Sequence, residues 1–533
     1  MKKDLFKAKS LATLCCFMLA FMSCANEDVA QKTTDTDSDN DKNLTTFSAG
    51  APESRTTMDY STGNFYWEAG DYIYVKDDNN VWRKSKNTPT AKTTFFNFKV
   101  DGDFNNSATY KVYYPGKNGT NNQVTIPAAQ TQTVPNTTIH FGESGDCGTA
   151  DATGTIGGKA FSFKLDHQAA YLVFQPYTTN KVLHDCYLTK IEVNSDNDIT
   201  DTYTLDPTTG ELTGTGSGQQ IVLTTKGSGA YAEGFPLTNT SADITTNGAC
   251  MIIKPGTHTL RIRYWVKGIT ENHRDIEGTV TKTLSSHFFA KNKYYNMIFN
   301  LNPRDYDGSH YYMWDAQQQY WFGHEWNKGG DQPTTDRISS NNYPQNNSDP
   351  RYYNETVPDD GMGYEAQTVL FKSLPNVNEL SWYVMKGDPR WDKDELWTSM
   401  GLLYKGGMWF LKKANIIDYS TEHSFYGIID LRTFDADQRT RRKYRYFKNT
   451  PSDVLPSATD ANKYFYLPAL GSYLRGGLGA VGSCGRYWTS SARPVQRSLE
   501  AYSLYIDRNL AQVRSLERCH GRIAQPFSDF GDE

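Results

Sequence analysis

The stretch FSFKLDHQAAYLVF, residues 161–174, contains two short apolar segments joined by polar residues. From Phe161 to Leu165 apolar and polar side chains alternate, which is the pattern of a strand with one buried face. From Tyr171 to Phe174 the chain is apolar throughout and rich in side chains that favour strands. We therefore predict two β-strands in this stretch.

The same pattern extends over residues 44–303. Short apolar segments recur at intervals of roughly 8–15 residues between Gly, Pro, Asn and Asp, which is typical of a β-sandwich. No segment keeps a 3.6-residue apolar period. Because about 260 residues is long for one sandwich, we predict two in tandem, over 44–178 and 179–303. The further strands predicted are 72–75, 95–100, 110–114, 124–126, 187–193, 251–254, 260–266 and 294–301.

The composition of the chain excludes one class of binding partner. Its 533 residues include 35 tyrosines, which favour strands, and carry a formal net charge of −5. An acidic chain lacks the basic surface that nucleic-acid binding requires. We therefore predict no nucleic-acid partner.

Residues 1–23 have the organisation of a bacterial lipoprotein signal peptide. Lys2 and Lys3 precede an apolar run from Leu11 to Met22, and Cys24 follows a small residue. A thioether at Cys24 would carry diacylglycerol, and two or more acyl chains make such an anchor stable. We predict removal of the signal and lipidation of Cys24. The alternative is an ordinary secretory signal with an incidental cysteine.

Residues 24–43 contain almost no bulky apolar side chain, so we predict a lipidated, disordered tether. Glu27 and Asp28, close behind the cysteine, resemble the surface-export signal of lipoproteins in Gram-negative gut anaerobes. We expect a chain that is anchored in the outer membrane and exposed on the cell surface.

Residues 304–533 have a different pattern, and we predict a separate α+β domain. Asn376 precedes apolar residues at helical spacing and Gly387 follows them, which predicts a capped helix. Residues 393–400 are predicted to form a second short helix. Its acidic beginning, with Asp392, Asp394 and Glu395, is interpreted as exposed. Strands are predicted at 464–467, 487–490, 502–506, 511–514 and 521–526.

Five cysteines follow Cys24, which excludes a disulfide-rich scaffold. An odd number in an oxidising compartment leaves at least one free thiol. Cys484 and Cys519 fall in the same predicted domain, where they either form a disulfide or remain two free thiols.

Six short motifs follow one another in the first 303 residues. They are LTTFSA (44–49), WEAGDYI (67–73), YYP (113–115), IPAAQ (126–130), FKLDH (163–167) and KYYN (293–296). In this order and spacing the chain resembles the fimbrillin-like (Mfa-like) pilus subunits.

The resemblance implies a mechanism of assembly. In such subunits the first strand is removed by cleavage after an arginine, and a strand of another subunit fills the groove by β-addition. Residues 44–49 would be that strand and Arg55 the cleavage site. Lys42 is a competing cleavage point, and an exposed loop arginine is the alternative interpretation of Arg55.

The tail resembles, over residues 365–527, a domain related to the C-type-lectin-like fold. The resemblance rests on LPA (467–469), GSCG (482–485), YWTSS (487–491) and AYSL (501–504). Aromatic rings can stack on the apolar faces of sugars, so Trp321 and Trp326 are candidate ligand-stacking residues. The calcium-binding triplets of lectins do not occur in the sequence.

No motif in the chain supports catalysis, so we predict no enzyme, no metal and no cofactor. Residues 477–482 match G-x-G-x-x-G, but the following residues indicate a strand and not the helix that dinucleotide binding requires. His324 and Glu325 lack the second histidine of a zinc motif. The pair Asp166–His167 is interpreted as structural.

We therefore predict a cell-surface lipoprotein that acts as a pilus tip or accessory subunit and adhesin, assembled by strand addition. Its partners would be other pilus subunits, and host or microbial glycans or proteins. The alternative is a non-polymerising surface glycan-binding lipoprotein.

Overall fold

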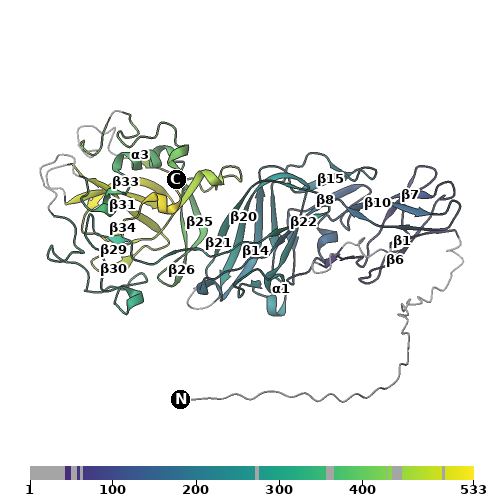
Figure 1. The fold of residues 1–533 in the computed structure, drawn as a ribbon, viewed down its shortest axis with the longest axis horizontal. Coiled ribbons are helices and arrows are strands. Elements are labelled where there is room, and N and C mark those ends of the chain that lie inside the picture. The colour runs from purple at the N-terminus through teal and green to yellow at the C-terminus, as the bar shows by residue number, and fades with distance from the viewer. Residues whose placement is uncertain are drawn as a thin grey trace, which may run out of the picture. The chain divides into compact units, whose positions relative to one another are not determined.

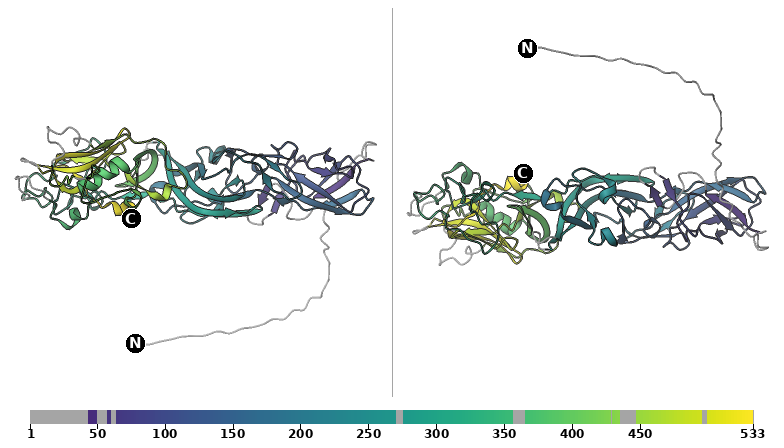
Figure 2. Two further views of the ribbon diagram at one scale, coloured as in Figure 1. Left: turned by 90° about the horizontal axis from the view of Figure 1, so that it is seen from above. Right: turned by 90° about the horizontal axis from the view of Figure 1, so that it is seen from below.

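The computed structural model describes residues 43–49, 57–59, 64–269, 275–355, 365–427, 429–434, 447–494 and 499–532. Strands predominate in every view, and helices are few and short (Figures 1 and 2). The fold is therefore mainly β, which confirms the predicted mainly β class. Among the described residues, no helix is both long and apolar enough to cross a bilayer.

The first sheet contains the N-terminal strand β1 as an inner member. Its order is β5-β4-β7-β10-β11-β1-β6, with β12 paired to β10. Its core is rich in aromatic rings, including the fully buried Trp67. The strands are β1 (Thr45–Ala49), β4 (Tyr74–Lys76), β5 (Trp82–Lys84), β6 (Phe96–Val100), β7 (Thr109–Tyr114), β10 (Gly148–Gly154), β11 (Ala160–Phe163) and β12 (Asp166–His167). A separate hairpin joins β2 (Thr57–Asp59) and β3 (Asn64–Tyr66).

A second core lies between a three-stranded sheet and part of a long sheet. The three-stranded sheet has the order β19-β13-β22, with β13 (Ala170–Phe174) between β19 (Ala249–Ile253) and β22 (Lys293–Met297). Every residue of β13 is buried, which explains its unbroken apolar sequence. Ile126, Phe141 and β13 all pack in this core. Residues on both sides of position 178, the predicted domain boundary, therefore share one core.

The long sheet runs through the second core into the tail in the order β28-β26-β25-β21-β20-β14-β17-β9. Leu396 and Leu403, from the tail, pack in the second core. The strands are β9 (Ala129–Thr131), β14 (Cys186–Ser195), β17 (Gln220–Thr224), β20 (Gly256–Gly268), β21 (Glu277–Phe289), β25 (Arg390–Ser399), β26 (Leu402–Leu411) and β28 (Tyr464–Pro468), with β18 (Phe235–Pro236) on β14 and β23 (Arg304–Tyr306) on β25. A small sheet joins β8 (Gln123–Ile126), β15 (Asp201–Leu205) and β16 (Leu212–Thr213).

The tail has a six-stranded sheet and most of the helical residues. The sheet has the order β24-β34-β31-β32-β33-β27, and a hairpin of β29 and β30 accompanies it. The strands are β24 (Tyr311–Tyr312), β27 (Lys448–Asn449), β29 (Ser472–Leu474), β30 (Gly477–Gly479), β31 (Cys484–Ala492), β32 (Glu500–Asp507), β33 (Leu510–Glu517) and β34 (Arg522–Ile523). The α-helices of the described chain are α1 (Ile244–Asn247), α2 (Val369–Lys372) and α3 (Val377–Lys386).

The predicted helix after Asn376 is confirmed as α3. The Asn376 side chain accepts a hydrogen bond from the backbone N–H of Glu379, and the Glu379 carboxylate accepts one from the N–H of Asn376. This reciprocal capping box satisfies two N–H groups that the helix itself leaves unpaired. Gly387 ends the helix, as predicted.

The predicted helix over 393–400 is wrong, because these residues belong to strand β25. β25 pairs with β26 on one side and with β23 on the other. These long-range ladders outweigh a weak local helical preference. The segment 477–482 forms part of a hairpin that leads into strand β31, so the structure lacks the helix that a dinucleotide site would need there.

Candidate functional site

Strand β1 is held on both sides. It pairs in parallel with β11 at four positions and antiparallel with β6 at five. Thr45, Phe47 and Ala49 are completely buried, while the residues between them are half-buried. This alternation arises because successive side chains of a strand point to opposite faces.

Phe47 anchors β1 in the first core. Its ring stacks on Phe161, with 5.3 Å between the centroids, and meets the edge of Phe104 at 5.1 Å. Tyr110 closes the same aromatic cluster at 6.4 Å. On the outer face Ser48 Oγ donates to Asn97 Oδ1 (2.8 Å). Burial of Phe47 is therefore the main apolar contribution that holds this strand.

Loss of β1 would leave a defined groove. Strands β6 and β11 would each lose a ladder partner, and the aromatic cluster around Phe161 would lose one ring. An unpaired edge beside an apolar pocket is the kind of site that accepts an extended segment by β-addition. The arrangement can thus exchange one strand for another of the same alternation.

The predicted lipidation and processing residues lie outside the residues that the structure describes; they are Cys24, Lys42 and Arg55.

Of the pair Asp166–His167, the aspartate is exposed, whereas the histidine belongs to a buried polar network. His167 Nδ1 lies 2.9 Å from Asp146 Oδ1, which also accepts a hydrogen bond from the Tyr171 hydroxyl (2.6 Å). Burial, and then the Asp146 carboxylate, raise the pKa of Tyr171 well above its ordinary value. Tyr171 therefore stays a neutral donor, and the structural interpretation of His167 is confirmed by its burial.

The predicted stacking platform at Trp321 is wrong. Trp321 is completely buried, with its ring 5.5 Å from Tyr320 and 5.4 Å from Tyr473. The aromatic rings of the tail core cover Trp321, so its ring is not accessible to a ligand. Trp326 is half-buried, and its Nε1 donates to the carbonyl of Asp307 (2.8 Å).

Cys484 and Cys519 are both free thiols, so the disulfide alternative is not realised. Cys484 lies opposite Asp507 at one end of β32, whereas Glu517, two residues before Cys519, lies opposite Glu500 at the other end.

Glu517, Cys519 and His520 form a cluster of potential metal ligands. The carboxylate lies 3.7 Å from the thiol and 3.6 Å from His520 Nε2. However, Arg522 Nη2 lies 3.2 Å from His520 Nδ1. Burial, and then Arg522, lower the pKa of His520 to about 4. A fixed guanidinium next to the ring repels a cation, so the cluster does not fit a metal ion.

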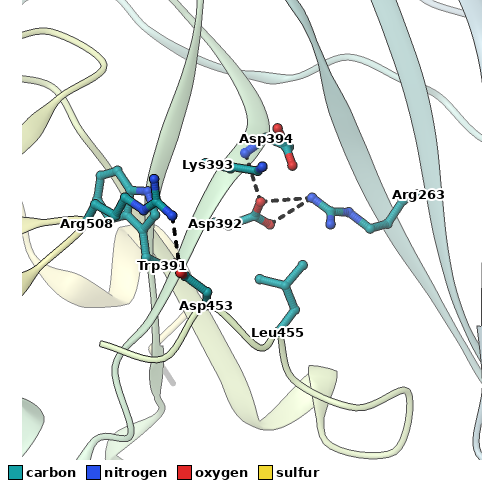
Figure 3. Close-up of a pocket in the computed structure, with 8 residues that line it drawn as sticks. All are labelled: Arg263, Trp391, Asp392, Lys393, Asp394, Asp453, Leu455 and Arg508. Carbon is teal, nitrogen blue, oxygen red and sulfur yellow. Dashed lines mark hydrogen bonds and ion pairs between the residues drawn. The ribbon is translucent and has the colours of Figure 1, made fainter. Parts of the chain in front are cut away.

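A buried ion pair connects the second core with the tail. Arg263 Nη2 donates to Asp392 Oδ1 (2.9 Å) and Oδ2 (3.1 Å), as Figure 3 shows. Asp392 is only 2% exposed, so the predicted exposed acidic helix start is wrong. The pairing of β25 with β26 is irregular between Asp392 and Leu396. This irregularity lies where the acidic residues contact β20 and β21.

Glu395 belongs to the same polar cluster. It accepts hydrogen bonds from the hydroxyl groups of Thr279 (3.0 Å) and Thr281 (2.6 Å). Burial, and then the Asp392 carboxylate, raise the pKa of Glu395 to about 7. Burial alone would lower the pKa of Arg263, but the two carboxylates raise it above its ordinary value. The Arg263 guanidinium thus interacts with two buried carboxylates, those of Asp392 and Glu395.

A cavity of about 210 Å³ opens beside this ion pair and is lined by the residues of Figure 3. Sequence reasoning missed Arg263, although a signal was present. On β20 the side chains of Leu260, Ile262, Tyr264 and Val266 are fully buried in the second core. The alternating residues, Arg261 and Arg263, must therefore lie on the opposite face, where β20 meets the tail.

Comparison with known proteins found similar solved structures. No protein-family profile and no curated protein matches the chain. A proposed cell adhesion protein from Bacteroides ovatus is 15% identical over 48% of this chain and 93% of its own, with a TM-score of 0.31. The fimbrial anchor protein Mfa2 from Porphyromonas gingivalis is 8% identical over 46% and 99%, with a TM-score of 0.21. A fimbrial assembly protein from Parabacteroides distasonis is 10% identical over 48% and 89%, with a TM-score of 0.22.

Proposed function

We propose that this chain is a surface-exposed component of a fimbrial or adhesive assembly, that it is made as a lipid-anchored precursor, and that it joins another subunit by strand addition at the β1 groove. The observation that carries the proposal is the position of β1. It is the first strand among the residues that the structure describes, yet it lies between β11 and β6. A terminal strand can leave without unthreading the rest of the sheet, and its loss opens two edges at once.

Hydrogen bonding and apolar burial both favour a slowly dissociating complex between two subunits. Each ladder hydrogen bond contributes roughly 0.5–1.5 kcal/mol net, and burial of one large apolar side chain adds roughly 1.5–3 kcal/mol. A partner strand with an aromatic residue at the Phe47 position would restore both contributions. Because β1 has partners on both sides, such a strand gains two ladders, and dissociation would be slow.

The predicted processing steps complete the proposal. Lipidation at Cys24 would hold the precursor in the outer membrane, and residues 24–43 would extend it from the surface. Cleavage after Arg55 would then separate β1 and the lipidated segment from the rest of the chain. Each step remains a prediction from the sequence.

A position at the tip, or as an accessory subunit, agrees with the packing of the last described residues. Phe530 is buried in the tail core, and Asp532 accepts hydrogen bonds from the Tyr383 hydroxyl and from the Lys413 N–H (2.7 Å). This segment is therefore engaged and is not available as a donor strand. The tail would instead be presented outward as the adhesive part.

Sequencing the N-terminus of the chain recovered from the cell surface and from sheared filaments tests the proposal. We expect a start at Thr56, and we expect Arg55→Gln to abolish both this start and the presence of the chain in filaments. Lys42→Gln is the matched control and should change neither. A lipidated start at Cys24 in every fraction, unaffected by Arg55→Gln, would contradict strand release and favour the non-polymerising binder.

A further inference from the structure

A second cavity, of about 230 Å³, lies between strands β20 and β21 on one side and β26 and residues 455–464 on the other. It adjoins the cavity of Figure 3, because Asp392 and Leu455 line both. It is distinct from the β1 groove, and nothing in the following argument depends on strand exchange. Its size is below that of pockets for drug-sized ligands and suits one small ring.

The cavity contains an incompletely satisfied guanidinium. Arg261 donates through Nη1 to the carbonyl of Pro456, while its Nε is buried without a hydrogen-bond partner. Burial, and then the neighbouring Arg263, lower the pKa of Arg261, yet an arginine stays charged in proteins. Because this nitrogen is closed off from solvent, a ligand in the cavity would contact the Nη side of the guanidinium.

The charges around the cavity favour an anion. Among the residues that the structure describes, neither Arg261 nor Lys412 forms an ion pair. Asp392 does not compensate them, because Arg263 Nη2 (2.9 Å) and the Trp409 Nε1 (3.2 Å) already donate to its two oxygens. Arg261 and Lys412 therefore bring two cationic groups to the cavity, and the nearby carboxylates of Glu192, Asp392 and Glu395 act to raise the pKa of Arg261. Charge-assisted hydrogen bonds from such cations to a carboxylate are about twice as strong as neutral ones.

The remaining walls combine an aromatic ring with neutral polar groups. Trp409 is half-buried, and its ring rests on Tyr466 at 4.9 Å between centroids, which fixes its orientation. Leu455 and Pro456 add apolar surface. Thr283 Oγ1 donates to Asn462 Oδ1 (3.0 Å), which leaves the Asn462 amide nitrogen as a donor. A sugar ring with one apolar face, hydroxyl groups and one acidic substituent matches this combination better than a flexible acidic side chain does.

We propose that this cavity binds one acidic sugar residue of the hexuronic acid class. The carboxylate lies at Arg261 and Lys412, an apolar face of the ring lies against Trp409, and the hydroxyl groups meet Thr283 and Asn462. The site differs from the stacking residues predicted from sequence, since it is built by the junction of the second core and the tail.

Isothermal titration calorimetry of the full chain with methyl glucuronide, methyl glucoside and acetate tests the proposal. We expect the glucuronide to bind at least tenfold more tightly than either of the others, because only it offers both the ring and the carboxylate. Equal affinity for the glucoside would refute the role of the cations. Equal affinity for acetate would refute the ring contact and leave a general carboxylate site. Absence of glucuronide binding would overturn the proposal.

Variants of the residues that line the cavity test whether the glucuronide binds there. Lys412→Gln should weaken glucuronide binding about tenfold. Arg261→Gln should also weaken glucuronide binding. Trp409→Leu should weaken the glucuronide and leave acetate unchanged. The matched control is Lys463→Gln, because Lys463 is next to Asn462 but already pairs with Asp460 (2.8 Å). An equal effect of Lys463→Gln and Lys412→Gln would contradict a site in this cavity.

Discussion

Replacing Phe47 by alanine tests whether β1 is held by its inward-facing side chains. Phe47 is completely buried against Phe161 and Phe104. Truncating a buried phenylalanine costs roughly 3–5 kcal/mol, through lost burial and the cavity that remains. Since each 1.4 kcal/mol is a factor of ten, opening of β1 should become roughly a hundredfold to several-thousandfold more frequent.

Amide hydrogen exchange of the folded, uncleaved chain measures this opening. The amides of β6 and β11 that bond to β1 should lose protection by that factor in Phe47→Ala. The control is Ser48→Ala, which removes only the exposed hydrogen bond to Asn97 and should change exchange by less than about tenfold. Equal exchange in the two variants would refute the anchoring role of Phe47. An equal rise in the tail strands would indicate global destabilisation and not release of one strand.

Three further predictions concern the second core and the tail. Arg263→Met should destabilise the chain by roughly 3–5 kcal/mol in thermal or denaturant unfolding, because it leaves Asp392 charged and buried, and a second change, Asp392→Leu, should recover most of the loss. If Asp392→Leu restored no stability, loss of the ion pair would not be the cause of the destabilisation. Because the folded pKa of Glu395, about 7, lies above its unfolded value, its protonation stabilises the fold below about pH 4.5, and this contribution is lost as the pH rises through 7. The stability difference between the natural chain and Glu395→Gln should follow that trend, and a difference independent of pH would contradict it. Under native conditions an alkylating reagent should modify Cys519 before Cys484, which is buried, and intact mass should show no disulfide between them; simultaneous modification would contradict the packing of Cys484.

Much of the strand arrangement follows from local sequence. Alternation of apolar and polar residues, interrupted by turn residues, identified β7, β11, β14 and β20, because the side-chain period of a strand is a local property. Helix α3 was predictable for a similar reason, since the Asn376 cap and Glu379 lie within one turn. The buried role of His167 also followed from its place between strands.

The partners of each segment depended on the tertiary structure. Residues 393–400 have little strand preference of their own, and only pairing with β26 and β23 makes them a strand. The Arg263–Asp392 pair joins residues 129 positions apart, so no local pattern could reveal it. Whether Trp321 is exposed or buried likewise depended on which rings surround it.

The sequence by itself thus determined the mainly β character, the positions of most strands and the capped helix, since these depend on neighbours along the chain. Only the tertiary structure decided that β1 lies between two other strands and that two arginines of β20 meet the tail. Sheet order and burial are set by contacts between distant residues, whose free energies no short stretch of sequence contains.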